Sequence, residues 1–337
     1  SSFDFSLWQR YIKSALRQRQ RLLTYSEPQG EYDLRCALAD YVRERRNVVT
    51  APEHIVVGAG VQMLLEILCV LLKGRRTVSF PDGSFVQGST VFAAHGYTVR
   101  TRYKDADIIY VSPSHMNRQG DVMPIQRRLE LCAHSADTGA VVIEDDFEND
   151  FLYSSTPTPS LYALGSGNVV YMGAFSALLL PGIRISFMVL SPALAAAYHQ
   201  MKDTFAQTAS KTEQIALCAY LRDGNMKSRT KKIRRLYTGK AKTLCALLAK
   251  ALPDHPVRVG ENGLQVQIET PILPDSAPFE QAGLALYIVK EKSGKNIVVV
   301  SPSAVPADRL EEAAHAVVAA LYKAEEAAKA KQSKDIY

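Results

Sequence analysis

The stretch VVYMGAFSALLLPGIRISFMVL, residues 169–190, decides the fold of this chain. Two apolar β-rich runs flank a turn that holds Ala174 to Ala177 and a Pro-Gly break. This pattern predicts two neighbouring strands of a buried sheet. The second run begins with Arg184, whose guanidinium is suited to two charge-assisted hydrogen bonds with a phosphate. A surface ion pair explains Arg184 equally well, so this residue alone does not assign a function.

Outward from this stretch, short β-rich runs alternate with segments of helical spacing between residues 53 and 190. Such alternation predicts an α/β fold with a mostly parallel sheet covered by helices on both faces. Ligands of these sheets bind where the strands end. The seven runs expected as strands are HIVVG (54–58), TVSF (77–80), YTVRTR (97–102), DIIYV (107–111), GAVVIE (139–144), NVVYM (168–172) and RISFMVL (184–190).

The chain of 337 residues is long enough for a large and a small domain. We expect an N-terminal arm or linker over 1–30, a large domain over 31–205 and a small C-terminal α+β domain over 206–330. The small domain shows strand patterns in GLQVQIE (263–269) and KNIVVVS (295–301). The tail, 331–337, is expected to fray, beginning beyond about Ala328.

Composition excludes several classes of protein. No apolar run reaches the roughly 20 residues that span a membrane, and the N-terminus lacks a signal-peptide core. Five scattered cysteines show no metal-ligand spacing, which predicts reduced thiols in a cytoplasmic protein and no metal site. The net charge of +6 is concentrated in 227–242 and 323–334, as either a nucleic-acid contact or a solvated helix surface.

Residues with binding chemistry follow the expected strands in order. The segment GAGVQ (58–62), with Gly60, Val61 and Gln62, joins a strand to a helix whose first N–H groups are suited to hold a phosphate, although a plain turn has the same pattern. Phe85 follows the next strand and is placed either over a flat ligand ring or in the core. His115 lies in the loop SPSHMNRQG (112–120), where a surface histidine is the alternative.

An acidic run, Glu144-Asp145-Asp146, follows directly after an apolar strand. At least one of these carboxylates is therefore expected at the buried edge of the sheet, where a negative charge needs a cationic partner. A protonated pyridine nitrogen is such a partner, and a solvated acidic turn is the alternative. Together, the strand-end residues outline a pocket for a phosphorylated, ring-protonated aromatic ligand, which describes pyridoxal 5′-phosphate (PLP).

The chain resembles the aminotransferase-like, fold-type I PLP domain of MocR-type bacterial transcription regulators, GabR-like proteins in particular. The resemblance is strongest between residues 28 and 192 and weaker in the small domain. The pieces that carry it are PQGEYDLRCALADYVRERRNV, IVVGAGVQMLLEIL, SPSHMNRQGDVMPIQRRLEL, VVIEDDFENDF and VVYMGAFSALLLPGIRISFMVLSP.

The resemblance implies a role for each matching position. Asp145 would pair with the pyridine nitrogen, Phe85 would stack on the ring, and His115 would border the ring's phenolic oxygen and the substrate. Phe147 stands where the family usually has a tyrosine, so one hydroxyl contact to the ring oxygen is missing. The cofactor-binding residues implied in this way are Gly60, Val61, Gln62, Phe85, His115, Asp145, Phe147, Ser176 and Arg184.

The residue after Ser176 is the lysine that forms the Schiff base in the family, and here it is Ala177. Without that amine, PLP cannot form an internal aldimine and the usual base of transamination is missing. We hypothesise that Ala177 is an engineered replacement of lysine, because its neighbours still fit a lysine site; a natural lysine-free relative is the competing explanation. Two other Ser-Lys pairs, at Lys211 and Lys334, are expected to carry solvated lysines.

The resulting prediction is the effector-binding and dimerisation domain of a transcription regulator. It would bind PLP, or an aldimine of PLP with an amino compound, as a homodimer, and control a DNA-binding winged helix that precedes residue 1. Gln87 replaces an arginine that GabR-like proteins carry near the substrate carboxylate, so GABA itself is not the expected effector. The alternative is an aminotransferase inactivated by loss of its catalytic lysine; a lysine-free PLP carrier, or a scaffold with no ligand, is a third interpretation.

Overall fold

The computed structural model describes residues 3–116, 121–147, 159–165, 167–176, 178–284, 286–291 and 293–334. By its internal contacts the chain forms two compact units. The first comprises Ser1–Met116, Met123–Asp150 and Thr156–Thr230, and the second comprises Asn117–Val122, Phe151–Ser155 and Lys231–Tyr337. The domain boundary expected at 205–206 stays a prediction; the contacts group the helix that follows it with the first unit.

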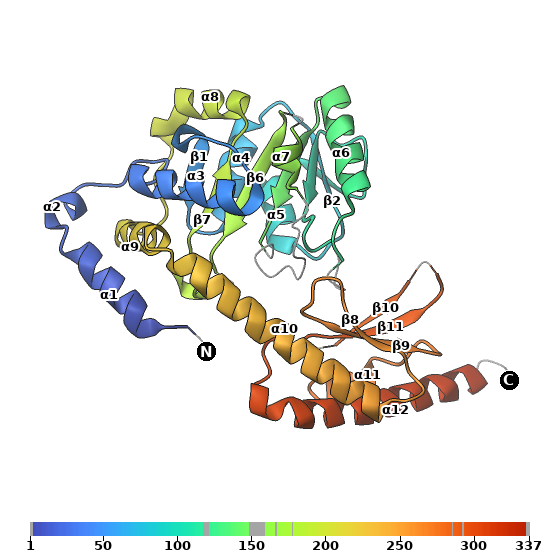
Figure 1. The fold of residues 1–337 in the computed structure, drawn as a ribbon. Coiled ribbons are helices and arrows are strands. Elements are labelled where there is room, and N and C mark those ends of the chain that lie inside the picture. The colour runs from blue at the N-terminus through green and yellow to red at the C-terminus, as the bar shows by residue number, and fades with distance from the viewer. Residues whose placement is uncertain are drawn as a thin grey trace. The chain divides into compact units, whose positions relative to one another are not determined.

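A seven-stranded sheet forms the centre of the first unit (Figure 1). Its strand order is β1-β7-β6-β5-β4-β2-β3, and all neighbours pair in parallel except β7, which is antiparallel to β1 and β6. The seven strands predicted from sequence are confirmed. They are β1 (Ile55–Gly58), β2 (Thr77–Phe80), β3 (Thr98–Thr101), β4 (Ile108–Val111), β5 (Val141–Asp145), β6 (Val169–Ala174) and β7 (Ser186–Val189).

Helices cover this sheet on both faces, as the continuous apolar character of its strands requires. On one face, α4 (Val61–Leu71), α5 (Val86–Ala94) and α8 (Pro192–Met201) contribute to a large apolar cluster with Ile108, Tyr110 and Ile143. On the other face, α6 (Ile125–Thr138) and α7 (Leu161–Leu164) pack on Val142 and Val169. Successive residues of β5 therefore alternate between the two clusters.

The N-terminal segment, expected as an arm, contains a helix packed on the first unit. Asp4 begins α1 (Phe5–Leu16) by accepting a hydrogen bond from the Leu7 N–H at 2.9 Å. α1 packs on α9 (Lys211–Arg222), where the rings of Trp8 and Tyr220 lie 5.8 Å apart. Two further helices, α2 (Arg19–Leu22) and α3 (Tyr32–Arg46), lead into the sheet.

The second unit is a smaller antiparallel sheet with helices. Its order is β10-β11-β9-β8, from β8 (Val257–Val259), β9 (Val266–Thr270), β10 (Tyr287–Lys290) and β11 (Asn296–Val300). The residues of α10 (Asn225–Ala251) after Thr230, together with α11 (Ala277–Gln281) and α12 (Leu310–Lys334), enclose its core. The sequence predicted β9 and β11 but missed the short strands β8 and β10. It also predicted fraying beyond Ala328, whereas α12 continues to Lys334 because alanine and lysine favour helix.

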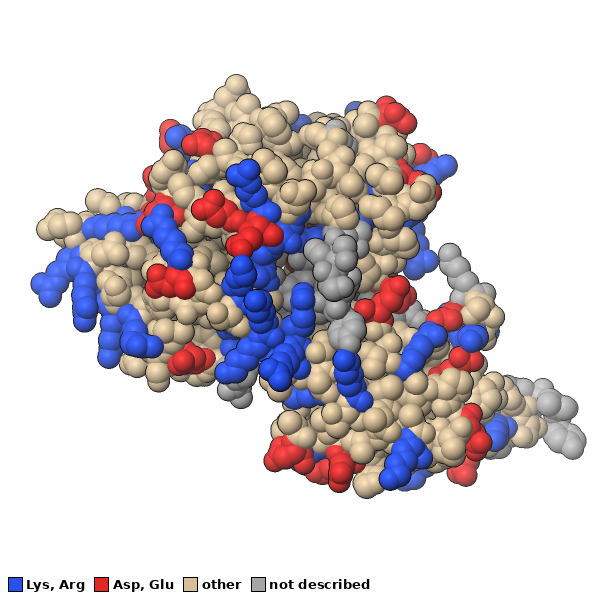
Figure 2. All heavy atoms as spheres, viewed as in Figure 1, with Lys and Arg blue, Asp and Glu red and all other residues tan. Residues whose placement is uncertain are grey.

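The basic segment 227–242 lies within α10, which contains no acidic residue. Figure 2 shows a group of Lys and Arg side chains where Figure 1 draws this helix. Some of these side chains bond to other segments: Lys227 pairs with Glu44 at 2.8 Å, and the Lys240 amine donates to the Ser303 carbonyl at 3.1 Å. Within the described ranges, no helix combines the length and apolar character needed to cross a bilayer.

Candidate functional site

The topology brings the strand-end residues predicted from sequence to one edge of the large sheet. The parallel strands β1, β2, β4, β5 and β6 end at this edge, and β7 begins there because it runs in the opposite direction. In chain order, the edge carries Gly60 with Val61 and Gln62 after β1, Phe85 after β2, His115 after β4, Asp145 at the end of β5, Ser176 after β6 and Arg184 before β7.

Arg184 lies directly against the turn between β1 and α4. A Cβ atom added to Gly60 would come within 3.3 Å of Arg184 Cζ and closer still to Nη2. Gly60 also has a φ of +93°, a conformation that side chains rarely tolerate. The absence of a side chain at Gly60 thus allows a guanidinium to sit beside the first N–H groups of α4. Cation and helix N-terminus together form a suitable site for a phosphate.

Phe85 is held at this edge by its own helix. It is the N-cap residue of α5, and a Cβ atom at Gly88 would lie 3.1 Å from its Cζ and closer to two other ring atoms. On the other side, the Phe85 ring lies 5.4 Å from the ring of Tyr110. Phe85 therefore packs partly against the core at this edge of the sheet. Its place over a flat ligand ring stays a prediction.

The acidic run divides between the two faces of β5. Asp145 follows Val141 and Ile143 on the face of the large aromatic cluster, where the Tyr110 hydroxyl donates to its Oδ2. Asp145 is only 7% exposed. Of the three carboxylates, Asp145 alone therefore shares a face with Phe85 and Tyr110.

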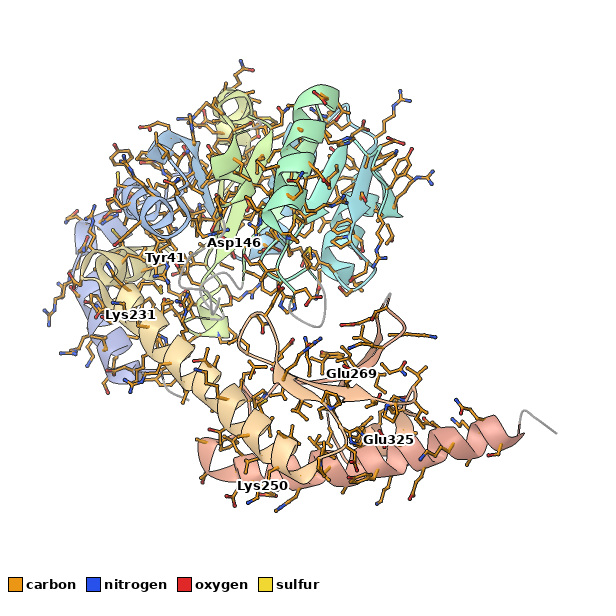
Figure 3. All side chains as sticks on the ribbon, turned by 45° about the vertical axis from the view of Figure 1, so that its right-hand side comes forward. Tyr41, Asp146, Lys231, Lys250, Glu269 and Glu325 are labelled. Carbon is orange, nitrogen blue, oxygen red and sulfur yellow. The ribbon has the colours of Figure 1, made fainter. Side chains whose placement is uncertain are left out.

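Glu144 and Asp146 lie on the opposite face and are engaged in structural bonds. Asp146, labelled in Figure 3, pairs with Arg46 at 2.7 Å and accepts hydrogen bonds from Ser114 at 2.6 Å and Tyr171 at 2.5 Å. Glu144 accepts the N–H groups of Leu161 and Tyr162 at the start of α7, at 2.8 and 3.0 Å. Burial, followed by the charge of Asp146, raises the pKa of Glu144 to about 7.

The remaining predicted residues are placed less closely. His115 and Phe147 contact each other, with ring centroids 5.6 Å apart. Ser176 follows the end of β6, and the neighbouring Phe175 N–H donates to the Ile185 carbonyl. Ala177, the position of the missing lysine, lies outside the described residues.

The expectation of a solvated lysine is wrong for Lys211. Its side chain is only 14% exposed, and its amine donates to the Thr24 carbonyl at 2.9 Å and the Tyr25 carbonyl at 3.3 Å. The amine thus holds the segment before α3, a long-range contact that local sequence does not show. The side chain of Lys334 lies outside the described residues.

Sequence reasoning missed several residues that shape this edge. Tyr110 showed only as an apolar strand position, and nothing local linked it to Asp145. The Thr208 hydroxyl accepts the Ala59 N–H at 2.9 Å and so supports the turn before Gly60. Arg46, the partner of Asp146, comes from the end of α3, a hundred positions earlier in the chain.

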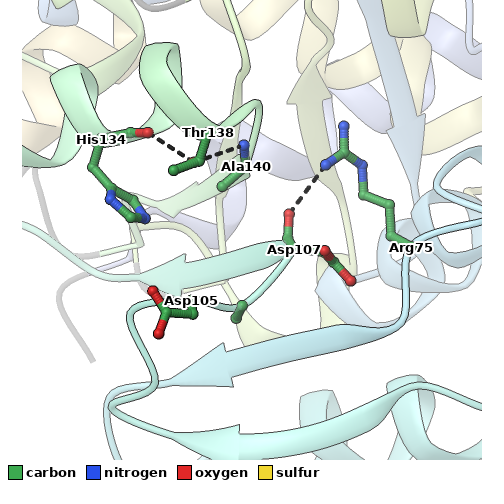
Figure 4. A pocket seen from close by; sticks show the side chains of 7 residues that line it. Arg75, Asp105, Asp107, His134, Thr138 and Ala140 are labelled. Carbon is green, nitrogen blue, oxygen red and sulfur yellow. Dashed lines mark hydrogen bonds between the residues drawn. The ribbon is translucent and has the colours of Figure 1, made fainter.

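A separate hollow of about 150 Å³ lies at the opposite edge of the sheet, where β2, β4 and β5 begin (Figure 4). Its polar groups mainly hold the turns together. The Arg75 guanidinium donates to the Gly139 carbonyl at 2.8 Å, and Asp107 accepts the Arg76 N–H at 2.7 Å. Backbone N–H donation, first from Arg76, lowers the pKa of Asp107. We assign no ligand to this hollow.

Comparison with known families agrees with the fold. The model of the family described as aminotransferase class I and II matches residues 3–109 and 102–271. The chain belongs to this family. The class I and II assignment accounts for the seven-stranded sheet and for the smaller antiparallel unit, which together are the fold-type I arrangement of PLP-dependent aminotransferases.

Two curated relatives of this aminotransferase-family chain are named as regulators. One is the uncharacterized HTH-type transcriptional regulator YdeL of Bacillus subtilis, which is 30% identical over 90% of this chain and 66% of its own length. Another is the probable rhizopine catabolism regulatory protein MocR of Rhizobium meliloti, 29% identical over 79% of this chain and 57% of its own length. The chain thus spans about three fifths of the regulators that it matches.

A solved structure shows the same fold. LysN, an α-aminoadipate aminotransferase from Thermus thermophilus complexed with N-(5′-phosphopyridoxyl)-L-leucine, superposes with a TM-score of 0.75. The match covers 96% of this chain and 90% of LysN at 22% identity. At that identity, the similarity of this aminotransferase-family chain to LysN concerns the fold.

Proposed function

We propose that this chain is the effector-binding and dimerising part of a MocR-type transcription regulator. It binds PLP, alone or joined to an amino compound, and thereby controls DNA binding by an N-terminal winged helix outside this chain. The observation that carries the proposal is the common edge of the sheet, where Arg184 lies against Gly60 and Asp145 shares the aromatic face with Phe85. The regulators among its relatives support the second half of the proposal.

The phosphate of PLP fits the Gly60–Arg184 cradle. Arg184 provides the charge, and the first turn of α4, at Val61 and Gln62, provides backbone N–H groups with the positive end of the helix dipole. Ser176 follows β6 at the same edge and adds a hydroxyl. A larger residue at Gly60 would displace the Arg184 guanidinium from this cradle.

The pyridine ring fits the face of the sheet that carries both Phe85 and Asp145. Phe85 would lie over the ring, Asp145 would pair with a protonated ring nitrogen, and His115 with Phe147 would border the ring. When bound, PLP supplies an electron-withdrawing ring and an aldehyde that reacts with amines. The residues of this chain bind and orient that group, and the resulting change in the population of conformations is the proposed signal.

Ala177 stands where the family has the lysine that serves as base and covalent anchor, so position 177 gives a test of the proposed location. A test replaces Ala177 with Lys, incubates the protein with PLP, reduces it with borohydride and maps the attached group by mass spectrometry. We expect attachment at residue 177, with the unaltered chain as the matched control. No attachment, or attachment only at other lysines in both proteins, would contradict the proposed location.

The alternative, an aminotransferase deprived of its lysine, is supported by the similarity of the fold to LysN. The same Ala177→Lys protein separates the two functions. An enzyme would exchange amino groups between an amino acid and a 2-oxo acid at a catalytic rate, whereas a sensor domain would bind PLP without sustained turnover. The gene provides a second criterion: a helix-turn-helix segment encoded before Ser1 supports the regulator.

The proposed homodimer is supported by apolar side chains exposed in the N-terminal part of the first unit. Leu16, Leu23 and Tyr25 are 52%, 78% and 102% exposed, which is unusual for neighbouring large apolar residues. A second copy of the chain would cover them. Light scattering of the chain at micromolar concentration should give a dimer, and Leu23→Asp should shift the mass toward a monomer; a monomeric unaltered chain would contradict this part of the proposal.

A further inference from the structure

We propose that Tyr110 is a positioning residue for the bound cofactor: its hydroxyl keeps the Asp145 carboxylate ionised and oriented toward the ring nitrogen. This inference rests on the proposed function, because it concerns the same site. It adds a residue that the sequence motifs do not point to. Tyr110 acts through Asp145 and need not touch the ligand.

The geometry joins the buried Tyr110 to Asp145. Tyr110 is 3% exposed, lies on β4, and donates its hydroxyl proton to Oδ2 of Asp145 on the neighbouring strand β5. Its ring packs against the rings of Phe80 and Phe85, with centroids at 5.0 and 5.4 Å. These contacts support the ring in the orientation that directs the hydroxyl at the carboxylate.

Tyr110 remains a proton donor at all ordinary pH values. Burial, reinforced by the negative charge of Asp145, raises the pKa of Tyr110 well above 10. A neutral phenol that donates to a carboxylate favours the ionised form of that carboxylate. Because Asp145 is only 7% exposed, its carboxylate needs such donors to stay charged.

Removing the hydroxyl has two consequences for a pyridine ligand. The carboxylate loses one fixed direction of hydrogen bonding, and it takes up a proton at a higher pH than before. A protonated carboxyl cannot form an ion pair with a pyridinium ring. Affinity for a ligand with a ring nitrogen should therefore fall, while affinity for a ligand without that nitrogen should not.

Other titrating groups nearby affect the unaltered and the substituted chain alike. Glu144, Asp146, Arg46 and Tyr171 lie on the opposite face of β5, where Asp146 bonds to Arg46 and Tyr171 and Glu144 accepts two backbone N–H groups. His115 lies in the loop after β4, at the same edge of the sheet. A comparison of two variants at each pH cancels these contributions.

The test is a cycle of two ligands and three proteins. The ligands are pyridoxine 5′-phosphate, which needs no lysine, and its analogue with carbon in place of the ring nitrogen. The proteins are the unaltered chain, Tyr110→Phe and Tyr97→Phe. Tyr97 is the matched control because it lies in the same apolar cluster and its buried hydroxyl donates to the Cys69 carbonyl at 2.8 Å, away from Asp145.

For Tyr110→Phe, we expect affinity for pyridoxine 5′-phosphate at pH 7 to fall about tenfold, or about 1.4 kcal/mol. Affinity for the carbon analogue should change less than about twofold, and Tyr97→Phe should change neither. In a pH series, the acid limb of pyridoxine 5′-phosphate affinity should move to higher pH in Tyr110→Phe. If Tyr110→Phe does not fold, 3-fluorotyrosine at position 110, a more acidic donor, should move the same limb to lower pH.

The outcomes separate the two proposals. Equal weakening of both ligands by Tyr110→Phe, or a response equal to that of Tyr97→Phe, overturns the role of Tyr110 while leaving the site intact. An unmoved acid limb with 3-fluorotyrosine does the same. An unaltered chain that binds neither ligand overturns the proposed function and this inference together.

Discussion

Successive carboxylates of the acidic run lie on opposite faces of β5 and have different environments. On one face, Glu144 and Asp146 are held by two backbone N–H groups, Arg46, Ser114 and Tyr171. On the other, Asp145 lies with the aromatic residues at the edge that also carries Arg184 and Gly60. Burial alone thus does not identify a functional acid. The face on which the acid lies, and the groups that share it, distinguish the two structural carboxylates from Asp145, which we propose meets a ligand.

The largest effect, a loss of stability, is expected on the face of β5 that carries Glu144 and Asp146. Arg46→Met removes the cation from a pair whose side chains are 3% and 0% exposed, and leaves Asp146 charged and buried. We expect the free energy of unfolding in urea to fall by about 3–5 kcal/mol. The control is Lys227→Met, which breaks an exposed pair with Glu44 and should cost less than about 1 kcal/mol. Equal losses in the two variants would contradict a structural role for Arg46.

On the face that Asp145 shares with Phe85 and Tyr110, the substitution Asp145→Asn should weaken ligand binding. A charged partner of the ring nitrogen is lost, so affinity for pyridoxine 5′-phosphate should fall about 100-fold, or about 2.7 kcal/mol, by titration calorimetry. Asp146→Asn is the matched variant one residue away, on the other face. It should reduce stability and leave the affinity of the folded protein within about threefold. If Asp146→Asn lost affinity and Asp145→Asn lost only stability, the roles assigned to the two carboxylates would be wrong.

The sequence predicted the large sheet and the common edge, but not the division of the acidic run between two faces. Alternating apolar and helical segments specify a parallel sheet, and strand ends specify where its site lies. Which carboxylate faces the site depends on where β5 ends and on partners far away in the chain, such as Arg46 and Tyr171. Tyr110 and Lys211 were missed for the same reason, because their contacts join segments that no local pattern connects.

A smaller effect should appear in the pH dependence of stability. Burial, then the charge of Asp146, raises the pKa of Glu144 from 4.5 to about 7. The folded chain therefore binds more protons than the unfolded chain between these values. The contribution of Glu144 is fully present below pH 4.5 and is lost as the pH rises through 7. Urea unfolding of Glu144→Gln should lack this decline; an unchanged slope would argue that Glu144 is ionised throughout.

The smallest effect concerns the phosphate cradle. Gly60→Ala places a methyl group against Arg184 and should weaken pyridoxine 5′-phosphate binding about tenfold, or about 1.4 kcal/mol. Gly96→Ala is the control, because Gly96 has a similar φ of +86° while its added Cβ would meet nothing within 4 Å. Both variants should lower the thermal unfolding temperature, because alanine is strained at a positive φ, and only Gly60→Ala should lose affinity for pyridoxine 5′-phosphate. If the two variants bound this ligand with equal affinity, the phosphate would not lie at Gly60.

The most direct test of the central claim is a crystal structure of this chain with pyridoxine 5′-phosphate. The account predicts the ring nitrogen within about 3 Å of the Asp145 carboxylate, on the face of Phe85 and Tyr110. It also predicts the phosphate between Arg184 and the first turn of α4. A ligand bound with its ring away from Asp145, or with its phosphate away from Arg184, would contradict it.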